Sequence, residues 1–321
     1  MEVSVGDSVS GSWAFGLDLG GTALKYGLVS DAGTLIRSRA VPTGAAEGRD
    51  AVIDRLRMAV AALREDAAEE GITVEKGGLG CPGTVDAGGT LTGALPNVPA
   101  LRGIPIVALL EEITGLPCAV DNDANAMVLA EAVAGAGQGL DPVLGVTVGT
   151  GIGAGIVIGG VIYRGLGAAG ELGHVRMVPE GRPCPCGGRG CLEQYASGSA
   201  LTRLHCERTG DDLDARELTG RWQHGDADAA ATIEAWAQSL ARGIGIALTL
   251  LHPACLVIGG GVMEAGEPLV SLLNREIRRA CLGIVVEDLV VRRAKLGTAA
   301  GVIGAGLLAF RTGAGRRTVP R

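Results

Sequence analysis

One short segment of the sequence carries a histidine and three cysteines at a spacing that suits a metal ion. Cys184, Cys186 and Cys191 lie within eight residues, and His174 precedes the first of them by ten. Three thiolates and one imidazole complete a tetrahedral set for Zn²⁺ and leave no position for a catalytic water. The glycines of CPCGGRGC allow the tight turns that such a loop needs. Three buried cysteines beside an unrelated histidine are the alternative, but this clustering in one Pro/Gly-rich loop favours a structural zinc site.

Three glycine turns, each at the end of an expected strand, could hold a nucleotide. They are DLGGTALK (18–25), GTGIG (149–153) and GGG (259–261). In the first turn the glycines let backbone N–H groups approach an anion, Thr22 can donate a hydroxyl and Lys25 supplies charge. A tight hairpin explains each turn equally well when it is taken alone. Neither a Walker loop nor a G-x-G-x-x-G that opens a helix is present, yet three such turns in a repeated unit favour a nucleotide site.

Two aspartates stand where phosphoryl transfer would need them. Asp123 follows a strand and opens a helix, so it can project into a cleft and accept a proton. Asp18 precedes the first glycine turn and is suited to hold Mg²⁺, directly or through water. Phosphoryl transfer needs little more than Mg²⁺, positioned phosphates and an acceptor for the nucleophile's proton. A helix N-cap is the alternative role for Asp123, and a solvated turn residue is the alternative for Asp18.

Length and composition limit the class of protein. The chain has 321 residues, which suits two lobes with a cleft, and it carries a net charge of −7, which argues against nucleic acid as a partner. No apolar run reaches membrane-spanning length, and residues 1–12 lack a basic start followed by an apolar core. We therefore expect no membrane partner, no signal peptide and a cytosolic location, where thiols stay reduced and bind metal.

The order of expected strands and helices repeats along the chain. Short apolar runs broken by glycine turns fill residues 14–41, and the same arrangement returns at 143–165. Gly16–Val29 aligns with Gly145–Ile158, since both are strands that end in a Gly-Thr turn before a second strand. Further expected strands cover 76–81, 117–121, 255–258 and 289–293, and expected helices cover 48–70, 124–136, 197–208, 227–251 and 297–310. Two such β-hairpin/α units facing each other would form a cleft between two lobes, an α/β fold.

These motifs together resemble the ROK family of bacterial sugar kinases. The matching segments run in family order from Asp18 to Val262: DLGGTALK (18–25), PGTVD (82–86), LPNV (95–98), DNDANA (121–126), VTVGTGIGAGIV (146–157), AGELGH (169–174), CPCGGRGCLEQYASG (184–198) and IGGGV (258–262). The resemblance implies the actin-like ATPase (ribonuclease H-like) fold. Residues 1–122 would form the smaller lobe, completed by a C-terminal helix at 299–312. Residues 123–298 would form the larger lobe, which carries the zinc loop.

The resemblance also implies a reaction. The chain would be an ATP-dependent hexose kinase that transfers the γ-phosphate to the sugar's 6-hydroxyl, with Asp123 as general base. The residues that match sugar-binding positions of the family are Asn97, Asn122, Asp123, Glu171, His174 and Glu193. His174 would bind structural zinc through one ring nitrogen and the sugar through the other.

The nucleotide positions follow from the same resemblance. Those that match the two phosphate loops and the adenosine site are Asp18, Gly20, Gly21, Thr22, Lys25, Thr150, Gly151, Gly260 and Gly261. The cofactors implied are ATP and Mg²⁺, with Zn²⁺ held by His174, Cys184, Cys186 and Cys191. We expect a homo-oligomer, a dimer or a tetramer.

Two departures from the family pattern affect the choice of sugar. Asp121 replaces the usual glutamate before Asn-Asp, and Leu101-Arg102 follow Asn97 where the family often has a tryptophan. We expect the packing behind the sugar to differ as a result. Glucose is the first acceptor expected, and the alternatives are N-acetylglucosamine, N-acetylmannosamine, glucosamine-like sugars, mannose and fructose.

Two readings without catalysis are disfavoured. A sugar-responsive transcriptional repressor of the same family would carry a helix-turn-helix domain before Asp18, and the residues before Asp18 leave no room for one. A non-catalytic sugar sensor would be expected to lack Asp123 or Lys25, and both are present.

Overall fold

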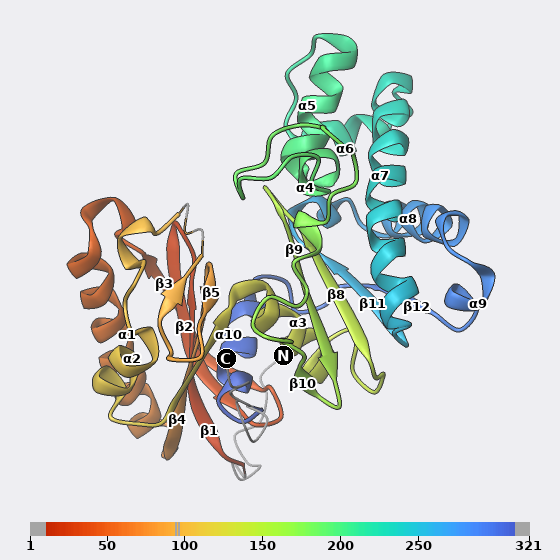
Figure 1. Ribbon diagram of the computed structural model, residues 1–321. Coiled ribbons are helices and arrows are strands. Elements are labelled where there is room, and N and C mark those ends of the chain that lie inside the picture. Colours follow the sequence, from red (N-terminus) through yellow and green to blue (C-terminus); the bar gives the residue numbers. More distant parts are fainter. Residues whose placement is uncertain (1–10, 94, 96, 312–321) are drawn as a thin grey trace. The chain divides into compact units, whose positions relative to one another are not determined.

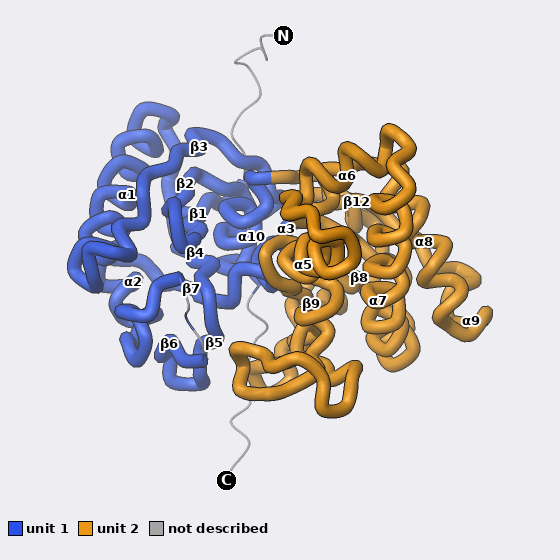
Figure 2. Tube along the Cα trace, turned by 90° about the horizontal axis from the view of Figure 1, so that it is seen from above, with its two compact units in different colours: residues 1–130, 298–321 blue, residues 131–297 orange. Residues whose placement is uncertain are grey.

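The computed structural model describes residues 11–93, 95 and 97–311. The chain divides into two compact units (Figures 1 and 2). Unit 1 consists of residues 1–130 and 298–321, and unit 2 consists of residues 131–297. Among the described residues, no helix is both long and apolar enough to cross a membrane.

Unit 1 is a five-stranded sheet with helices on both faces (Figure 1). The strand order is β3-β2-β1-β4-β7, in which the first three strands are antiparallel and β4 and β7 run parallel to β1. The strands are β1 (Trp13–Leu19), β2 (Ala23–Ser30), β3 (Leu35–Pro42), β4 (Val74–Cys81) and β7 (Cys118–Asn122), with a hairpin of β5 (Thr84–Val85) and β6 (Leu91–Thr92). The helices are η1 (Ala45–Glu47), α1 (Arg49–Glu69), η2 (Pro99–Leu101), α2 (Ile106–Thr114) and α10 (Ala300–Leu308), together with the start of α3 (Asp123–Ala134).

Successive residues along each strand of this sheet point to opposite faces. Phe15 and Leu17 of β1 belong to the buried cluster that also contains residues of α1 and α2. Gly16 and Gly78 point to the opposite face, where a Cβ on Gly78 would lie 1.8 Å from the backbone oxygen of Ala305 in α10. The glycine- and alanine-rich helix α10 can therefore lie directly on the strands, which is how a chain with few aromatic residues packs this face.

Unit 2 repeats the same sheet. Its strand order is β10-β9-β8-β11-β12, again with the first three antiparallel and the last two parallel to the central strand. The strands are β8 (Val143–Val148), β9 (Ile152–Ile158), β10 (Val161–Ile162), β11 (Cys255–Gly259) and β12 (Val290–Arg293). The helices are η3 (Leu172–His174), α4 (Glu193–Ala196), α5 (Gly198–Thr209), α6 (Ala215–Gln223), α7 (Ala227–Leu251), η4 (Gly261–Ala265), α8 (Glu267–Ala280) and α9 (Gly283–Val286). The predicted α/β fold with a duplicated β-hairpin unit is confirmed.

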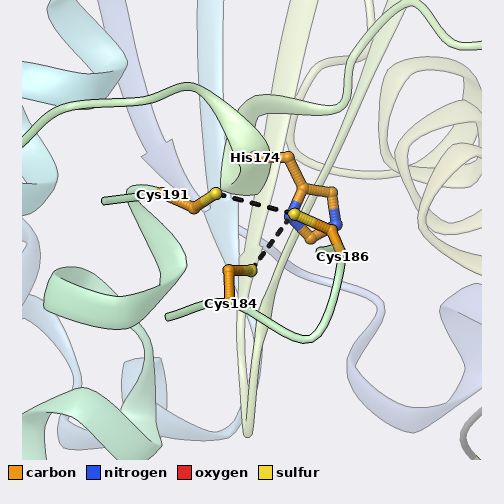
Figure 3. Close-up of side chains that lie close together, drawn as sticks. All are labelled: His174, Cys184, Cys186 and Cys191. Carbon is orange, nitrogen blue, oxygen red and sulfur yellow. Dashed lines mark hydrogen bonds between the residues drawn. The ribbon is translucent and has the colours of Figure 1, made fainter. Parts of the chain in front are cut away.

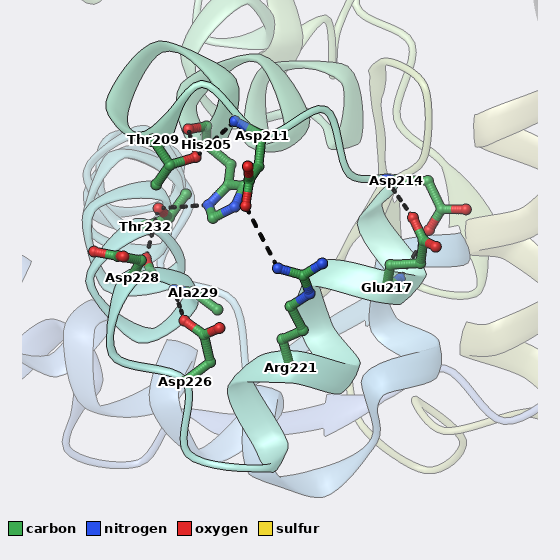
Figure 4. A network of polar contacts seen from close by, with 10 residues as sticks. All are labelled: His205, Thr209, Asp211, Asp214, Glu217, Arg221, Asp226, Asp228, Ala229 and Thr232. Carbon is green, nitrogen blue, oxygen red and sulfur yellow. Dashed lines mark hydrogen bonds and ion pairs between the residues drawn. The ribbon is translucent and has the colours of Figure 1, made fainter.

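Polar caps fix the helices that follow the cysteine loop. The Ser197 side chain caps α5 by accepting a hydrogen bond from the backbone of Ala200, and the Ser197 carbonyl accepts one from the Trp236 indole at 3.1 Å. Figure 4 shows the neighbouring network, in which His205 of α5 contacts Thr232 of α7 at 3.2 Å and Arg221 of α6 pairs with Asp211 at 3.5 Å. These contacts join α5, α6 and α7 into one support for the segment that contains Glu193.

The units divide within α3 rather than before it. Ala126 packs against Gly80 and Gly304 of unit 1, whereas Glu131 accepts hydrogen bonds from the backbone N–H groups of Lys295 and Leu296 in unit 2. The division therefore falls between residues 130 and 131, eight residues after the boundary expected between 122 and 123. The C-terminal return to unit 1 begins at Thr298, next to the expected residue 299.

Candidate active site and metal centre

The first glycine turn connects β1 to β2 in unit 1. The Gly20 N–H donates to the Ala23 carbonyl at 3.0 Å, and the Thr43 hydroxyl donates to the Gly20 carbonyl at 2.6 Å. Asp18 and Lys25 are directly opposite each other in the β1–β2 register. The turn thus brings a carboxylate, an ammonium group and the exposed Thr22 to one end of the sheet.

Asp18 is buried, with 6% of its surface exposed. Burial raises the pKa of its carboxyl to about 6; the nearby Lys25 lowers this pKa and the nearby Asp123 raises it. Among the described residues no hydrogen bond to this carboxylate is found. A buried carboxylate without hydrogen-bond donors is costly unless a cation compensates it, so the environment of Asp18 fits a site for Mg²⁺.

The junction between β7 and α3 is held by its own side chains. Asp121 accepts hydrogen bonds from the Asn122 backbone at 2.7 Å and from the Asn125 amide at 2.9 Å. The Asn122 side chain accepts from the Ala124 backbone at 2.9 Å and donates to the Gly83 carbonyl at 3.0 Å. Asn122 therefore caps the start of α3, and Asp121 holds the junction through its two hydrogen bonds.

Asp123 is the first residue of α3 and is half-buried. Burial raises the pKa of its carboxyl, while hydrogen bonds from the Ala124 backbone, from its own backbone and from Asn122 lower it. The Ala124 N–H donates to Asp123 Oδ1 at 2.9 Å. A raised pKa brings a carboxylate closer to the basicity that a general base needs near neutral pH.

Asn97 and the first glycine turn are in direct contact. A Cβ on Gly21 would lie 2.5 Å from the Cβ of Asn97, which is too close for two carbon atoms, so this contact requires glycine at position 21. The Asn97 side chain is exposed. Unit 1 therefore brings together two residues expected at the nucleotide, Asp18 and Gly21, and two expected at the sugar, Asn97 and Asp123.

The second glycine turn lies between β8 and β9 of unit 2. Its backbone closes through a hydrogen bond from the Gly149 N–H to the Gly151 carbonyl at 3.0 Å. Glu193 Oε2 accepts a hydrogen bond from the Ile152 N–H at 3.0 Å, and a Cβ on Gly151 would lie 2.4 Å from the same oxygen. Glu193 is therefore in contact with the turn that contains Thr150 and Gly151.

Gly260 follows β11 with φ +94°, a conformation that L side chains rarely adopt. A Cβ at this position would lie 2.4 Å from the Val148 carbonyl oxygen at the end of β8. The bare backbone of Gly260, followed by Gly261 at the start of η4, therefore lies beside the end of the strand that enters the second glycine turn.

The four expected zinc ligands are brought together in unit 2 (Figure 3). Their ligand atoms all lie within 4.8 Å of one another. Cys186 Sγ lies 3.7 Å from Cys191 Sγ, and Cys184 Sγ lies 3.7 Å from His174 Nδ1. Zn–S bonds of ~2.3 Å and a Zn–N bond of ~2.0–2.1 Å in a tetrahedron separate two sulfurs by about 3.8 Å and a sulfur from a nitrogen by about 3.6 Å. The donor atoms and these two separations therefore fit Zn²⁺.

The two ring nitrogens of His174 face different groups. Nδ1 faces the cysteine cluster, whereas Nε2 lies 3.9 Å from Glu171 Oε2. The Glu171 and His174 side chains are 47% and 38% exposed, so a ligand can reach them. Backbone bridges between Arg176 and Cys191 and between Pro183 and Arg189 hold the loop in shape.

The C-terminal helix lies in unit 1, as the sequence predicts, but its contacts with the first glycine turn were not predicted. Lys25 Nζ donates to the Thr298 carbonyl at 3.5 Å, and Gly301 lies against the carboxylate of Asp18. The sequence signal for this segment is Gly301, because alanine is the better helix former and a glycine in the first turn of a helix indicates a close contact.

The family profile and the similar proteins that match this chain all indicate one family. Residues 14–312 match the sequence profile described as the ROK family. The chain is 33% identical over 316 residues to a glucokinase of Halalkalibacterium halodurans, which covers 94% of this chain and 96% of that protein. It is 32% identical over 307 residues to an N-acetyl-D-glucosamine kinase of Photobacterium profundum, which covers 92% of this chain and 98% of that protein.

Solved structures agree with these relatives. A ROK hexokinase from Thermus thermophilus has a TM-score of 0.82 at 38% identity, covering 93% of this chain and 98% of its own. A ROK family glucokinase from Streptomyces griseus, solved in complex with glucose and AMPPNP, has a TM-score of 0.78 at 33% identity, covering 93% of this chain and 99% of its own.

Proposed function

This chain belongs to the ROK family, and we propose that it is an ATP-dependent kinase that phosphorylates the 6-hydroxyl of glucose. The observation that carries the proposal is the placement of Asp123. A half-buried carboxylate with a raised pKa begins α3, in the same unit as the first glycine turn, Asp18 and Asn97. This arrangement supplies a proton acceptor and a phosphate-binding turn together, as phosphoryl transfer to an alcohol requires.

In the proposed reaction, Asp123 accepts the proton of the sugar 6-hydroxyl as the oxygen attacks the γ-phosphorus of ATP. The bond between the γ-phosphorus and the bridging oxygen breaks, ADP leaves, and the proton stays on the Asp123 carboxyl until it passes to solvent. The raised pKa of Asp123 favours this transfer, because a more basic carboxylate is the better acceptor. Mg²⁺ bound with ATP would neutralise charge on the phosphates, and Asp18 is the residue proposed to hold it.

We assign the nucleotide to the glycine turns. The first turn, with Gly20, Gly21, Thr22 and Lys25, would bind phosphates through backbone N–H groups, a hydroxyl and an ammonium group. The residues assigned to the second phosphate turn and to adenosine are Thr150, Gly151, Gly260 and Gly261. The exposed backbone of Gly260 beside the end of β8 supports the adenosine assignment.

Sugar contacts are assigned to Asn97, Asn122 and Asp123 in unit 1 and to Glu171, His174 and Glu193 in unit 2. The directions of the two His174 ring nitrogens support its proposed role as both zinc ligand and sugar contact, because Nδ1 faces the cysteines and Nε2 faces Glu171. We propose that Zn²⁺ is structural. Its ligand set of one histidine and three cysteines leaves no open position, and its loss would free the ring that contacts the sugar.

An N-acetylated hexose is the second candidate acceptor. The similarity to an N-acetyl-D-glucosamine kinase is nearly as high as that to a glucokinase, and Leu101-Arg102 follow Asn97 where a tryptophan is common in the family. The dimer or tetramer and the cytosolic location expected from the sequence stay predictions.

The test is ADP release measured by a coupled assay with glucose, mannose, fructose, glucosamine, N-acetylglucosamine and N-acetylmannosamine. Glucose is expected to give the highest kcat/KM, and Asp123→Asn is the matched negative control. A higher kcat/KM for an N-acetylated hexose would replace glucose as the acceptor. Absence of sugar-dependent ADP release with every member of the panel would overturn the kinase assignment.

A further inference from the structure

We infer that Gly301 is a positioning residue whose missing side chain lets the Asp18 carboxylate take up its working position. Gly301 is the second residue of α10, 283 positions after Asp18 in the chain, and both residues belong to unit 1. The inference deepens the proposed function and rests on it, because it concerns the carboxylate assigned to Mg²⁺.

The contact involves the whole carboxylate group. A Cβ on Gly301 would lie 2.2 Å from Asp18 Oδ2, 2.5 Å from Cγ and 3.0 Å from Oδ1. The first two distances are shorter than real Cβ atoms show, so any larger residue at position 301 requires the carboxylate to move. Gly301 is thus in van der Waals contact with the charged end of Asp18.

The two other glycines of α10, Gly304 and Gly306, contact groups of a different kind. A Cβ on Gly304 would meet the backbone oxygen of Ala126 at 1.8 Å, and a Cβ on Gly306 would meet the branched side chain of Val29 at 2.4 Å. Neither neighbouring atom can move unless the backbone of Ala126 or Val29 moves with it. Gly301 faces the end of a side chain that can rotate about its own bonds, so a substitution there displaces the carboxylate and leaves the backbone in place.

The surroundings of Asp18 belong to the same segment. Lys25, opposite Asp18 in the sheet, donates to the carbonyl of Thr298, three residues before Gly301. Residues 298–301 therefore form one wall around the Asp18–Lys25 pair, and the C-terminal return of the chain becomes part of the phosphate-turn site.

The size of the effect follows from the distances. Carbon and oxygen atoms in contact are normally about 3.3 Å apart or more, so Asp18 Oδ2 would have to move by about 1 Å from a Cβ at 2.2 Å. A displacement of about 1 Å in an active site can cost on the order of 100-fold in rate. Stability should not fall, because alanine is the better helix former.

Gly301→Ala is the test variant, and Gly220→Ala in α6 is the matched control. A Cβ on Gly220 meets nothing within 4 Å, so this change also adds a methyl group to a helix but displaces nothing. For Gly301→Ala we expect kcat to fall about 10- to 100-fold, calorimetric binding of Mg·ADP to weaken, glucose binding to stay within about twofold and Tm to stay equal or rise. Gly220→Ala should keep the wild-type kcat.

Asp18→Ala separates this inference from the proposed function. With the carboxylate removed, Gly301→Ala should cause no further loss of Mg·ADP affinity and should raise Tm. If Asp18→Ala keeps wild-type activity, the role proposed for Asp18 is wrong. If Asp18→Ala is inactive while Gly301→Ala keeps kcat within twofold of wild type, only the inference about Gly301 is wrong. A lower Tm that persists in the Asp18→Ala background would make Gly301 a packing residue and would also overturn the inference.

Discussion

Asp18→Asn should make the ligand-free protein more stable while it removes activity. Burial raises the pKa of Asp18 from 3.8 to about 6, so the folded chain binds this proton more tightly than the unfolded chain. The proton therefore adds stability that is complete below pH 3.8 and is lost as pH rises through 6. At ~1.4 kcal/mol per pKa unit, the ionised carboxylate leaves the fold about 3 kcal/mol less stable above pH 6 than below pH 3.8.

Asparagine has nearly the same shape and no charge at any pH. In urea denaturation without nucleotide or Mg²⁺, the free energy of unfolding of Asp18→Asn should exceed that of the wild type by up to about 3 kcal/mol at pH 8. At pH 5 the difference should fall to about half, because the wild-type carboxyl is then mostly protonated in the folded chain. The gain in stability with loss of activity is the trade-off expected of a charged group buried for function.

Asp288→Asn is the control for this experiment, since Asp288 is an exposed carboxylate. It should change the free energy of unfolding by less than about 0.5 kcal/mol at either pH. The reasoning would be refuted if Asp18→Asn were less stable than the wild type at pH 8, or if its advantage were the same at pH 5 and pH 8. In either case burial of the ionised carboxylate would not be the cause of the raised pKa.

Three further substitutions test the other parts of the site. Asp123→Asn should lower kcat by about two to four orders of magnitude with glucose affinity nearly intact, and a mutant with more than a tenth of wild-type kcat in the coupled assay would remove Asp123 from the role of base. Gly21→Val should raise the KM values for both ATP and glucose, because its side chain would displace Asn97; steady-state kinetics in which only the ATP constant moves would contradict this contact. Cys186→Ser should lose zinc, measured by atomic emission, and weaken glucose binding through His174 while calorimetric ATP affinity holds. A zinc-free variant with wild-type sugar affinity would make the loop a structural element only, and a wild-type protein without zinc would remove the metal site.

Features that depend on neighbouring residues could be predicted from the sequence. Cys184, Cys186 and Cys191 are close in space because a short glycine loop joins them, and His174 lies only ten residues earlier. The two β-hairpins were recognised in the same way, since a glycine turn between two apolar runs determines which strands pair. Asn122 as the cap of α3 follows from its place between a strand and a helix.

Contacts between distant segments were decided by the tertiary structure. Gly301 meets Asp18, Gly21 meets Asn97 and Glu193 binds the turn at Gly151, although each pair is separated by 42 to 283 residues in the chain. The family resemblance gave roles to most of these residues but not their contacts with one another. No local pattern contains such a contact, because side-chain packing is set only once the sheets and helices have assembled.

The same limit applies to the chemistry of the carboxylates. The sequence by itself identified Asp18 and Asp123 as candidates from their places beside a turn and a helix. Their raised pKa values depend on how much water the surrounding strands and helices exclude and on which charges lie nearby. The division of the chain at residue 130 was likewise decided by packing, because Ala126 lies against Gly304 and Glu131 binds the backbone of Lys295. The sequence determined which groups are present and the local turns that hold them, and only the folded chain determined their burial, their partners and therefore their proton affinity.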